Sequence, residues 1–258
     1  MNKNTAIIVG TGFIGSHICK ILENDFQIVA IDNNKNTLDS LDQSYYKVEL
    51  DCLDKKDTET VFNNIFENHN DPTVLVNSLG VDVKINSDDN FAEFEAQDIN
   101  EFEEAVVANL KSVFLTSQSF YKNLKNVNKK GVILNISSDL GHIAPDHRLY
   151  NENNETFPNQ KPAHYSVSKF GLEGFTKYLA ATTAPLLRVN SLCPSGIINS
   201  SMDEKFQEKL KNLNPQKGIM ELNDLNSAVK FLTSEESKFV NGQSIIIDGG
   251  RSILWAIY

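Results

Sequence analysis

The amino-acid sequence predicts an α/β fold of the Rossmann-like, doubly wound kind, with a mainly parallel seven-stranded sheet and helices on both of its faces. Short apolar runs rich in β-branched residues alternate with amphipathic stretches along the whole chain, and this alternation is typical of parallel sheets. Several runs are almost entirely apolar, as expected of strands covered on both faces. Because the chain shows no internal repeat, linker or break in composition, residues 1–258 are predicted to form one domain.

The strands are predicted from the apolar runs, and the helices from the amphipathic stretches between them. In chain order, the predicted strands are Ala6–Val9, Ile28–Ile31, Lys47–Leu50, Val74–Asn77, Val132–Ile136, Arg188–Leu192 and Ser244–Ile247. The predicted helices are Ile14–Glu23, Asp57–Asn68, Ile99–Leu124, Ala163–Ala181 and Asn223–Leu232.

Two stretches do not fit this alternation. The segment Val83–Asp98 is polar and acidic, and we expect a loop there before a long helix. The segment Gly141–Lys161 is a long polar connection without a helical or strand pattern. Within a compact domain, a connection of this length is usually functional or disordered.

Composition excludes several classes of function. The chain is 40% hydrophobic and 22% charged, with a net charge of −10, so an ordinary globular core is expected and a nucleic-acid or anionic-membrane partner is not. There is no apolar run of membrane-spanning length and no signal-peptide pattern. Three scattered cysteines, Cys19, Cys52 and Cys193, are expected to be reduced thiols. The sequence therefore predicts a cytoplasmic protein.

A glycine-rich segment, GTGFIG, joins the first predicted strand to the first predicted helix. Glycines in this setting let the backbone approach a pyrophosphate, whose charge then lies at the helix N-terminus. Asp32 ends the second predicted strand, where a carboxylate accepts hydrogen bonds from ribose hydroxyls and repels a 2′-phosphate. We therefore predict that NAD is preferred, while Lys35 nearby leaves NADP possible. The residues predicted here to bind the cofactor are Gly10, Gly12, Phe13, Ile14, Gly15 and Asp32.

Tyr165 and Lys169 are four residues apart, a spacing that places two side chains on one helix face. The spacing alone carries little weight, since Tyr121 and Lys125 repeat it in a stretch that is better explained as a helix surface. Tyr165 differs because a buried strand upstream runs directly into Ser137 and Ser138. Ligands bind at the carboxyl ends of strands in open α/β sheets. We therefore predict that a serine of this strand end, Tyr165 and Lys169 belong to one active site.

Over essentially its whole length, the chain resembles the short-chain dehydrogenase/reductases. The matching segments are LDCLD around Asp51, NSLG ending at Gly80, VANLKSVF around Asn109, NISS ending at Ser138, YSVSK, NSLCPSG and NGQSIIIDGG. The resemblance implies a catalytic tetrad of Asn109, Ser138, Tyr165 and Lys169. It also implies that Asp51, Cys52, Asn77, Gly80, Tyr165, Lys169, Pro194, Gly196 and Ile197 contact the cofactor.

The chemistry expected of these residues is an exchange between an alcohol and a ketone. A tyrosine has an ordinary pKa near 10, and the ammonium of Lys169 is expected to lower it so that Tyr165 can transfer a proton. Ser138 is expected to bind the substrate oxygen. Asn109 is expected to position the helix and a water linked to Lys169. The hydride passes to or from the cofactor.

The long connection before Tyr165 is predicted to arch over the active site and to determine specificity. With the following helix it resembles a bacterial subgroup linked to flagellin modification and surface-sugar biosynthesis, which suggests a sugar, sugar phosphate or polyol as substrate. His147 and Arg148 lie in it and are predicted to contact the substrate, with solvated loop residues as the alternative. The histidines and Asp146 of this region match no familiar metal-binding spacing, so no metal site is predicted.

Two other functions stay open at this point. The shortened glycine loop, in which Val9 stands where a threonine is usual, is similar to that of nucleotide-sugar epimerases and dehydratases that retain NAD. A non-catalytic dinucleotide-binding regulatory protein is the second alternative, because fold does not fix function. The resemblance also implies a homodimer or homotetramer, and the apolar stretch 253–258 is predicted to pack either in a subunit contact or on its own domain.

Overall fold

The computed structural model describes residues 3–80, 93–151, 159–200 and 202–253. Seven strands form one sheet in the order β3-β2-β1-β4-β5-β6-β7, and every neighbouring pair is parallel. The strands are β1 (Thr5–Val9), β2 (Gln27–Asp32), β3 (Tyr46–Glu49), β4 (Pro72–Asn77), β5 (Gly131–Ile136), β6 (Leu187–Pro194) and β7 (Ser244–Ile247). The predicted fold class is therefore confirmed, and all seven predicted strands are present.

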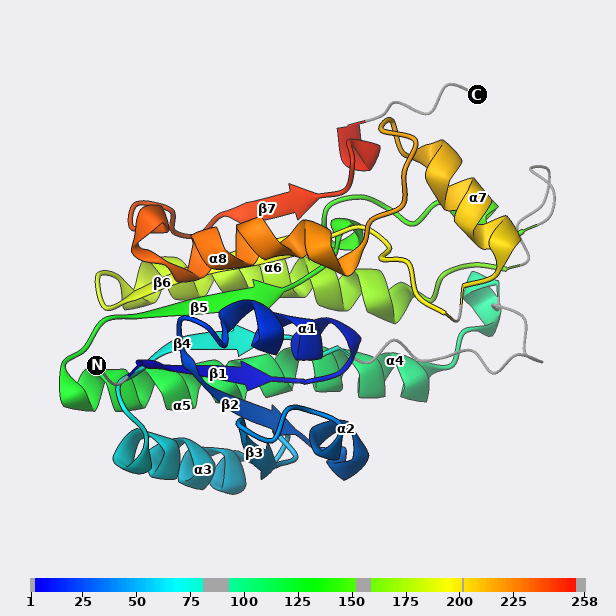
Figure 1. Ribbon diagram of the computed structural model, residues 1–258. Helices are drawn as coiled ribbons and strands as arrows, with labels where there is room; N and C mark the ends of the chain where they lie inside the picture. Colours follow the sequence, from blue (N-terminus) through cyan, green and yellow to red (C-terminus); the bar gives the residue numbers. More distant parts are fainter. Residues whose placement is uncertain (1–2, 81–92, 152–158, 201, 254–258) are drawn as a thin grey trace.

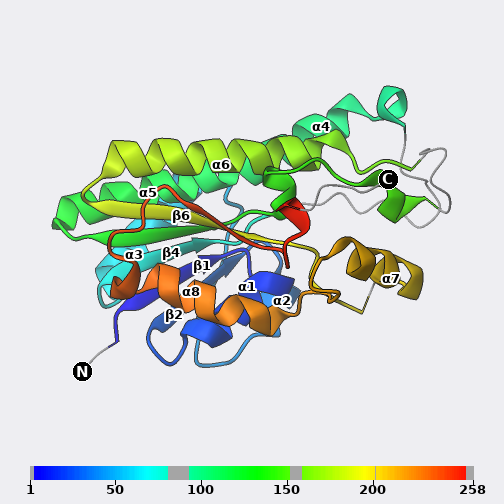
Figure 2. The same ribbon diagram turned by 90° about the horizontal axis from the view of Figure 1, so that it is seen from above.

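Helices cover both faces of this sheet (Figure 1). They are α1 (Phe13–Leu22), α2 (Lys35–Asp39), α3 (Lys55–Asn68), α4 (Ile99–Val106), α5 (Ser112–Val127), α6 (Ala163–Thr183), α7 (Glu204–Leu213) and α8 (Asn226–Thr233). Figure 2 shows α4 and α6 along one side of the sheet, with α1 and α8 along the other. None of the described helices combines the length and apolar character needed to cross a membrane.

Two hydrophobic cores lie on opposite faces of the sheet because side chains alternate along each strand. On β1, Ala6 and Ile8 point into the core that contains α1 and α8. Ile7 and Val9 point into the other core, with side chains of α3, α5 and α6. The apolar runs that predicted the strands are thus explained by burial on both faces.

The helical prediction differs from the structure at four places. The predicted helix Ile99–Leu124 is interrupted by a π-helical turn at Val107–Lys111, which separates α4 from α5. The short helix α2 and the helix α7 were not predicted. In the long connection before Tyr165, a 3₁₀ turn forms at His147–Tyr150, so this connection is not structureless throughout.

Parts of several predictions lie outside the described residues. These parts are residues 83–92 of the acidic loop, residues 152–158 of the long connection and residues 254–258 of the apolar tail.

The strand order creates a crevice between β1 and β4. From β1 the chain continues outward through β2 and β3 on one side, and through β4, β5, β6 and β7 on the other. The loops that follow β1 and β4 therefore run in opposite directions from the carboxyl ends of these strands. In open α/β sheets, ligands bind where the direction of the strand order reverses in this way.

Candidate active site

A cavity of about 450 Å³ lies at the carboxyl edge of the sheet. The segment after β1, the residues 78–80 after β4, the end of β5 and the end of β6 all contribute to its wall. The remaining wall comes from the long connection, from α6, from α7 and the segment before it, and from Arg251. Segments that are far apart in the sequence therefore meet at the position where the strand order predicts a ligand.

The glycine loop fits the requirements of a pyrophosphate cradle. Gly10 has a φ of +81°, and a Cβ there would lie 2.7 Å from the carbonyl oxygen of Ser78. A Cβ on Gly15 would lie only 1.9 Å from the carbonyl oxygen of Gly10. By contrast, a Cβ on Gly12 would meet nothing within 4 Å, and Gly12 faces the cavity together with Phe13 and Ile14. The loop thus leaves open space at the N-terminus of α1, where a phosphate is favourably bound.

Asp32, at the end of β2, is tied to this loop. Its Oδ2 accepts hydrogen bonds from the backbone N–H of Thr11 at 2.7 Å and from the Thr11 hydroxyl at 3.2 Å. Its Oδ1 accepts a hydrogen bond from the N–H of Asn34 at 2.9 Å. The carboxylate is therefore held at the strand end next to the glycine loop, as its predicted role in binding a ribose requires.

The other predicted cofactor residues divide into two groups. Gly80 lines the cavity, and a Cβ on it would lie 3.5 Å from the Lys169 ammonium. Asp51, Cys52 and Asn77 are not among the residues that line it. Asp51 is exposed. The Cys52 thiol lies in the core, and its burial raises its pKa to about 12.

Asn77 is buried, and its side chain turns inward rather than to the cavity. It donates to the side-chain oxygen of Asn135 at 2.9 Å and accepts from the hydroxyl of Thr116 at 2.8 Å. These bonds connect β4 to β5 and to α5. Asn77 thereby holds the strand end from which residues 78–80 reach the cavity.

Tyr165, Lys169 and Ser138 meet at the cavity wall. The ammonium of Lys169 lies 5.7 Å from the centre of the Tyr165 ring and donates to the carbonyl oxygen of Ile136, the last residue of β5, at 3.2 Å. Lys169 is buried. The structure therefore brings together the three groups that the sequence places in one site.

Asn109 lies in the π-helical turn and is buried. Its side-chain amide donates to the hydroxyl of Ser168 at 3.0 Å, and that hydroxyl donates to the carbonyl oxygen of Tyr165 at 2.9 Å. Single π-helical turns occur frequently at functional sites. Here the turn directs Asn109 to the first turns of α6, so Asn109 reaches Tyr165 through Ser168.

A buried ion pair lies directly behind Ser138. The Ser138 hydroxyl donates to Asp139 Oδ1 at 3.0 Å and accepts from the N–H of Leu140 at 3.2 Å. Asp139 Oδ2 accepts from Arg251 Nη1 at 2.8 Å. Burial raises the pKa of Asp139, while the charge of Arg251 opposes that shift. This pair was not predicted, because its two partners come from opposite ends of the active-site region in the sequence.

We expect Asp139→Asn to lower the free energy of unfolding by roughly 3–5 kcal/mol, because the buried guanidinium of Arg251 would lose its charged partner. The double variant Asp139→Asn/Arg251→Met is expected to be more stable than the single one, since it removes the unpaired charge. Urea unfolding of the three proteins would measure both effects. Equal stability of wild type and Asp139→Asn would show that the ion pair makes no net contribution to the free energy of unfolding.

The wall on the substrate side comes from two segments that pack together. The rings of Tyr150 and Phe206 lie 5.7 Å apart, and the Lys209 ammonium of α7 donates to the carbonyl oxygen of Asn151. A Cβ on Gly196 would lie 2.9 Å from the side chain of Leu210, so α7 rests closely on the end of β6. Pro194, Ser195, Gly196 and Ile197 all line the cavity.

His147 and Arg148, the predicted substrate contacts, do not line this cavity; Leu149, Tyr150 and Lys161 from the same connection do. Arg148 is bound to the carboxylate of Asp146, with Nη2 to Oδ2 at 2.6 Å. Burial alone would raise the pKa of Asp146, but the hydrogen bonds from Arg148 hold it below its ordinary value. His147 Nδ1 accepts from the N–H of Lys161 at 3.3 Å. Both residues therefore hold the connection in place in this structure.

Comparison with known proteins identifies the family. The model of a family described as enoyl-(acyl carrier protein) reductase matches residues 14–252. The post-translational flagellin modification protein A of Campylobacter coli is 31% identical, over 96% of this chain and 98% of the relative. A 3-oxoacyl-[acyl-carrier-protein] reductase of Buchnera aphidicola is 27% identical, over 96% and 97%.

A solved structure agrees with these relatives. The crystal structure of a short chain dehydrogenase from Leptospira borgpetersenii with bound NAD⁺ has a TM-score of 0.85 and 30% identity, over 98% of this chain and 94% of that one. The two chains therefore share their fold over nearly their whole length. The chain therefore belongs to the short-chain dehydrogenase/reductase family of oxidoreductases.

Proposed function

We propose that the protein interconverts an alcohol and a ketone by hydride transfer, and that the substrate is a sugar, sugar phosphate or polyol used in surface-glycan biosynthesis. The observation that carries the reaction type is the meeting of Ser138, Tyr165 and Lys169 at one cavity, next to a glycine loop with open space. The relative named as a flagellin modification protein supports the substrate class.

In this proposal each side chain has a separate task. Tyr165 transfers the proton of the substrate oxygen through its hydroxyl. The buried ammonium of Lys169 stabilises the tyrosinate by its charge. Ser138 binds the substrate oxygen by donating its hydroxyl proton, which in this structure is directed to Asp139 and would turn to the substrate oxygen when a substrate is bound. When bound, the nicotinamide cofactor supplies or accepts the hydride.

We also propose that NAD is the preferred cofactor. The Asp32 carboxylate lies beside the glycine loop, where it would repel a 2′-phosphate. The relative from Leptospira borgpetersenii was solved with NAD⁺ bound. Phe13, Ile14, Gly80 and Ile197 would contact the cofactor from the cavity wall. The side chains of three predicted residues do not line the cavity, so these residues would contribute to cofactor binding only through the position of the neighbouring backbone. They are Asp51, Cys52 and Asn77.

Replacing Asp32 with asparagine is expected to lower the preference for NAD over NADP by at least about tenfold, because the charge that repels a 2′-phosphate is removed. The asparagine oxygen can still accept the hydrogen bond from the Thr11 N–H, while the bond from the Asn34 N–H is lost, so urea unfolding should confirm that the variant is folded. The measurement is kcat/KM with each cofactor. Asp39→Asn, at an exposed carboxylate of α2, is the control. An unchanged ratio in Asp32→Asn would contradict the role of this residue.

The apolar part of the cavity wall favours a second substrate class. Leu149, Met202, Phe206 and Leu210 line it, and such side chains suit an acyl chain better than a hydroxylated ring. A relative named as a 3-oxoacyl-[acyl-carrier-protein] reductase matches almost the whole chain. Reduction of a 3-oxoacyl thioester is therefore the second candidate.

A substrate panel separates the two candidates. Oxidation of sugars, sugar phosphates and polyols would be followed by NADH formation, and reduction of acetoacetyl thioesters by NADH consumption. We expect turnover in the first set. Turnover confined to the thioesters would overturn the sugar assignment and leave the reaction type intact. No turnover with either set, and no change in Tyr165→Phe, would favour a non-catalytic dinucleotide-binding protein.

The epimerase or dehydratase alternative has its own signature. Such an enzyme regenerates its NAD in each cycle, so it would retain cofactor through purification and release no net NADH. Cofactor content of the purified protein, measured after denaturation, together with NADH release, distinguishes it from the proposed dehydrogenase.

We further propose that the protein is a homodimer or homotetramer. The helices α5 and α6 expose large apolar side chains, among them Phe114, Phe170 and Tyr178, with 45%, 49% and 64% of their surface accessible. Burying these rings against a second copy would remove apolar surface from water. Light scattering of the purified protein measures its mass, and a monomer at micromolar concentration would contradict this assignment.

A further inference from the structure

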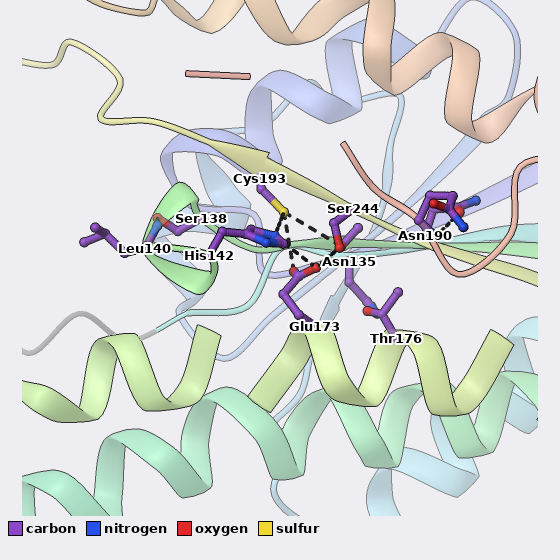
Figure 3. A network of polar contacts seen from close by, with 11 residues as sticks. Asn135, Ser138, Leu140, His142, Glu173, Thr176, Asn190, Cys193 and Ser244 are labelled. Atoms are coloured by element: carbon purple, nitrogen blue, oxygen red, sulfur yellow. Dashed lines mark hydrogen bonds and ion pairs between the residues drawn. The ribbon is translucent and has the colours of Figure 1, made fainter. Parts of the chain in front are cut away.

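Behind the cavity wall, three potential metal ligands from distant parts of the chain meet. They are His142, Glu173 and Cys193, and their ligand atoms all lie within 4.8 Å of one another. Figure 3 shows their side chains pointing toward one another between the sheet and α6. None of the three lines the cavity, so the catalytic proposal does not use them.

The spacing of the three groups is close to that of a tetrahedral zinc site. Bond lengths of about 2.3 Å to sulfur and about 2.0–2.1 Å to nitrogen and oxygen imply separations of roughly 3.3–3.5 Å between ligand atoms. Cys193 Sγ lies 3.5 Å from His142 Nε2 and 3.4 Å from Glu173 Oε1. His142 Nε2 lies 3.4 Å from Glu173 Oε2. The thiol thus faces one carboxylate oxygen and the imidazole the other, and one ligand atom from each of the three groups lies within 4.8 Å of the other two, so a small inward movement of the side chains would let all three reach one cation.

The carboxylate is oriented by neighbouring residues, as metal-binding carboxylates usually are. Glu173 Oε2 accepts hydrogen bonds from the hydroxyls of Ser191, at 2.6 Å, and of Ser244. These bonds fix the carboxylate so that Oε1 faces the thiol. Glu173 is 4% exposed and Cys193 is fully buried, whereas the His142 side chain is 23% exposed. A cation would therefore reach the cluster past His142, and a water would complete its coordination.

The site would connect the three segments that build the active site. His142 directly follows the 3₁₀ turn Asp139–Gly141, which Ser138 caps. Glu173 lies one helical turn beyond Lys169 on α6. Cys193 directly precedes Pro194, which lines the cavity. A single ion at this point would fix the positions of Ser138, Lys169 and the end of β6 relative to one another.

We propose that His142, Glu173 and Cys193 bind a divalent cation of the zinc class, which stabilises the frame of the active site. The mixed nitrogen, oxygen and sulfur ligands suit Zn²⁺ better than Mg²⁺ or Ca²⁺. On binding, the Cys193 thiol loses its proton to solvent and the thiolate coordinates the ion. In this structure the thiol donates to Glu173 Oε1 at 3.4 Å.

The experiment titrates the chelator-treated full-length protein with Zn²⁺ and, separately, with Co²⁺. We expect one ion per chain, release of about one proton per ion at neutral pH, and an absorption band of thiolate-to-cobalt charge transfer. Cys193→Ser should lose the band, His142→Gln should bind at least tenfold more weakly, and Ser191→Ala should bind about 10–100-fold more weakly. Cys19→Ser, at a buried cysteine of α1, is the matched control and should behave as wild type.

Two results would overturn the proposal. The first is wild-type protein that binds neither ion stoichiometrically, in which case the three groups form only a hydrogen-bonded network. The second is a band that persists in Cys193→Ser or disappears in Cys19→Ser. If Cys193→Ser does not fold, His142→Gln decides, because its side chain is partly exposed and its replacement leaves the core unchanged. All of these readouts are independent of catalytic activity.

Discussion

Tyr165→Phe is expected to reduce kcat by about 10²–10⁴-fold, which is the usual contribution of a general acid or base. The phenyl ring keeps the contacts of the tyrosine ring, including its position 5.7 Å from the Lys169 ammonium. Stability and cofactor affinity should therefore change little, and only the proton-transferring hydroxyl is lost. Initial rates with the best substrate of the panel, together with NADH binding by fluorescence, measure these quantities separately.

The chain contains a matched control for this variant. Tyr121 and Lys125 repeat the spacing of Tyr165 and Lys169, but they lie on α5, and neither lines the cavity. Tyr121→Phe should retain wild-type kcat. The role of Tyr165 would be refuted by a Tyr165→Phe protein that kept more than a tenth of wild-type kcat, or by an equal loss in Tyr121→Phe.

Gly15→Ala is expected to destabilise the folded protein by on the order of 3 kcal/mol or more, since overpacking against backbone cannot relax by a side-chain movement. The added methyl would lie 1.9 Å from the carbonyl oxygen of Gly10. Either the glycine loop or the start of α1 would have to shift. The chemical denaturation midpoint and the yield of folded protein measure this effect.

Gly12→Ala separates folding from cofactor binding within the same loop. Its methyl would enter open space, and we expect a change of less than about 1 kcal/mol in the free energy of unfolding, because glycine is itself only a moderate N-cap residue. Cofactor affinity should nevertheless fall, because the methyl would stand where the pyrophosphate approaches. Wild-type affinity in Gly12→Ala would contradict the predicted cofactor position.

The sheet could be predicted from the sequence because burial on both faces leaves an almost uniform apolar signal, as in the run Ile28–Ile31. The interruption of the helix around Asn109 could not be predicted from the sequence, because one extra residue in a helical turn leaves the apolar pattern nearly unchanged. The helix α7 did carry a signal. Phe206, Leu210 and Leu213 recur at helical spacing after Asp203, whose side chain accepts from the N–H of Phe206.

Within the site, predictability depended on what each role requires. A residue that must contact a ligand at a strand end, such as Ser138, follows from the strand pattern and the family resemblance. Side-chain partners that come from distant segments do not. Arg251 is an example, because the sequence shows its charge but not that Asp139 binds it. The meeting of His142 with Glu173 and Cys193 depends in the same way on tertiary structure alone.

The ion pair between Asp139 and Arg251 has a consequence for how the protein acquires activity during its synthesis. The ribosome makes the chain from the N-terminus, so Ser138, Tyr165 and Lys169 all emerge well before Arg251. The carboxylate of Asp139 accepts a hydrogen bond from the Ser138 hydroxyl. Until residue 251 has been made and has docked, this buried carboxylate has no guanidinium beside it. The surroundings of Ser138 are therefore completed only after the C-terminal part of the chain has docked.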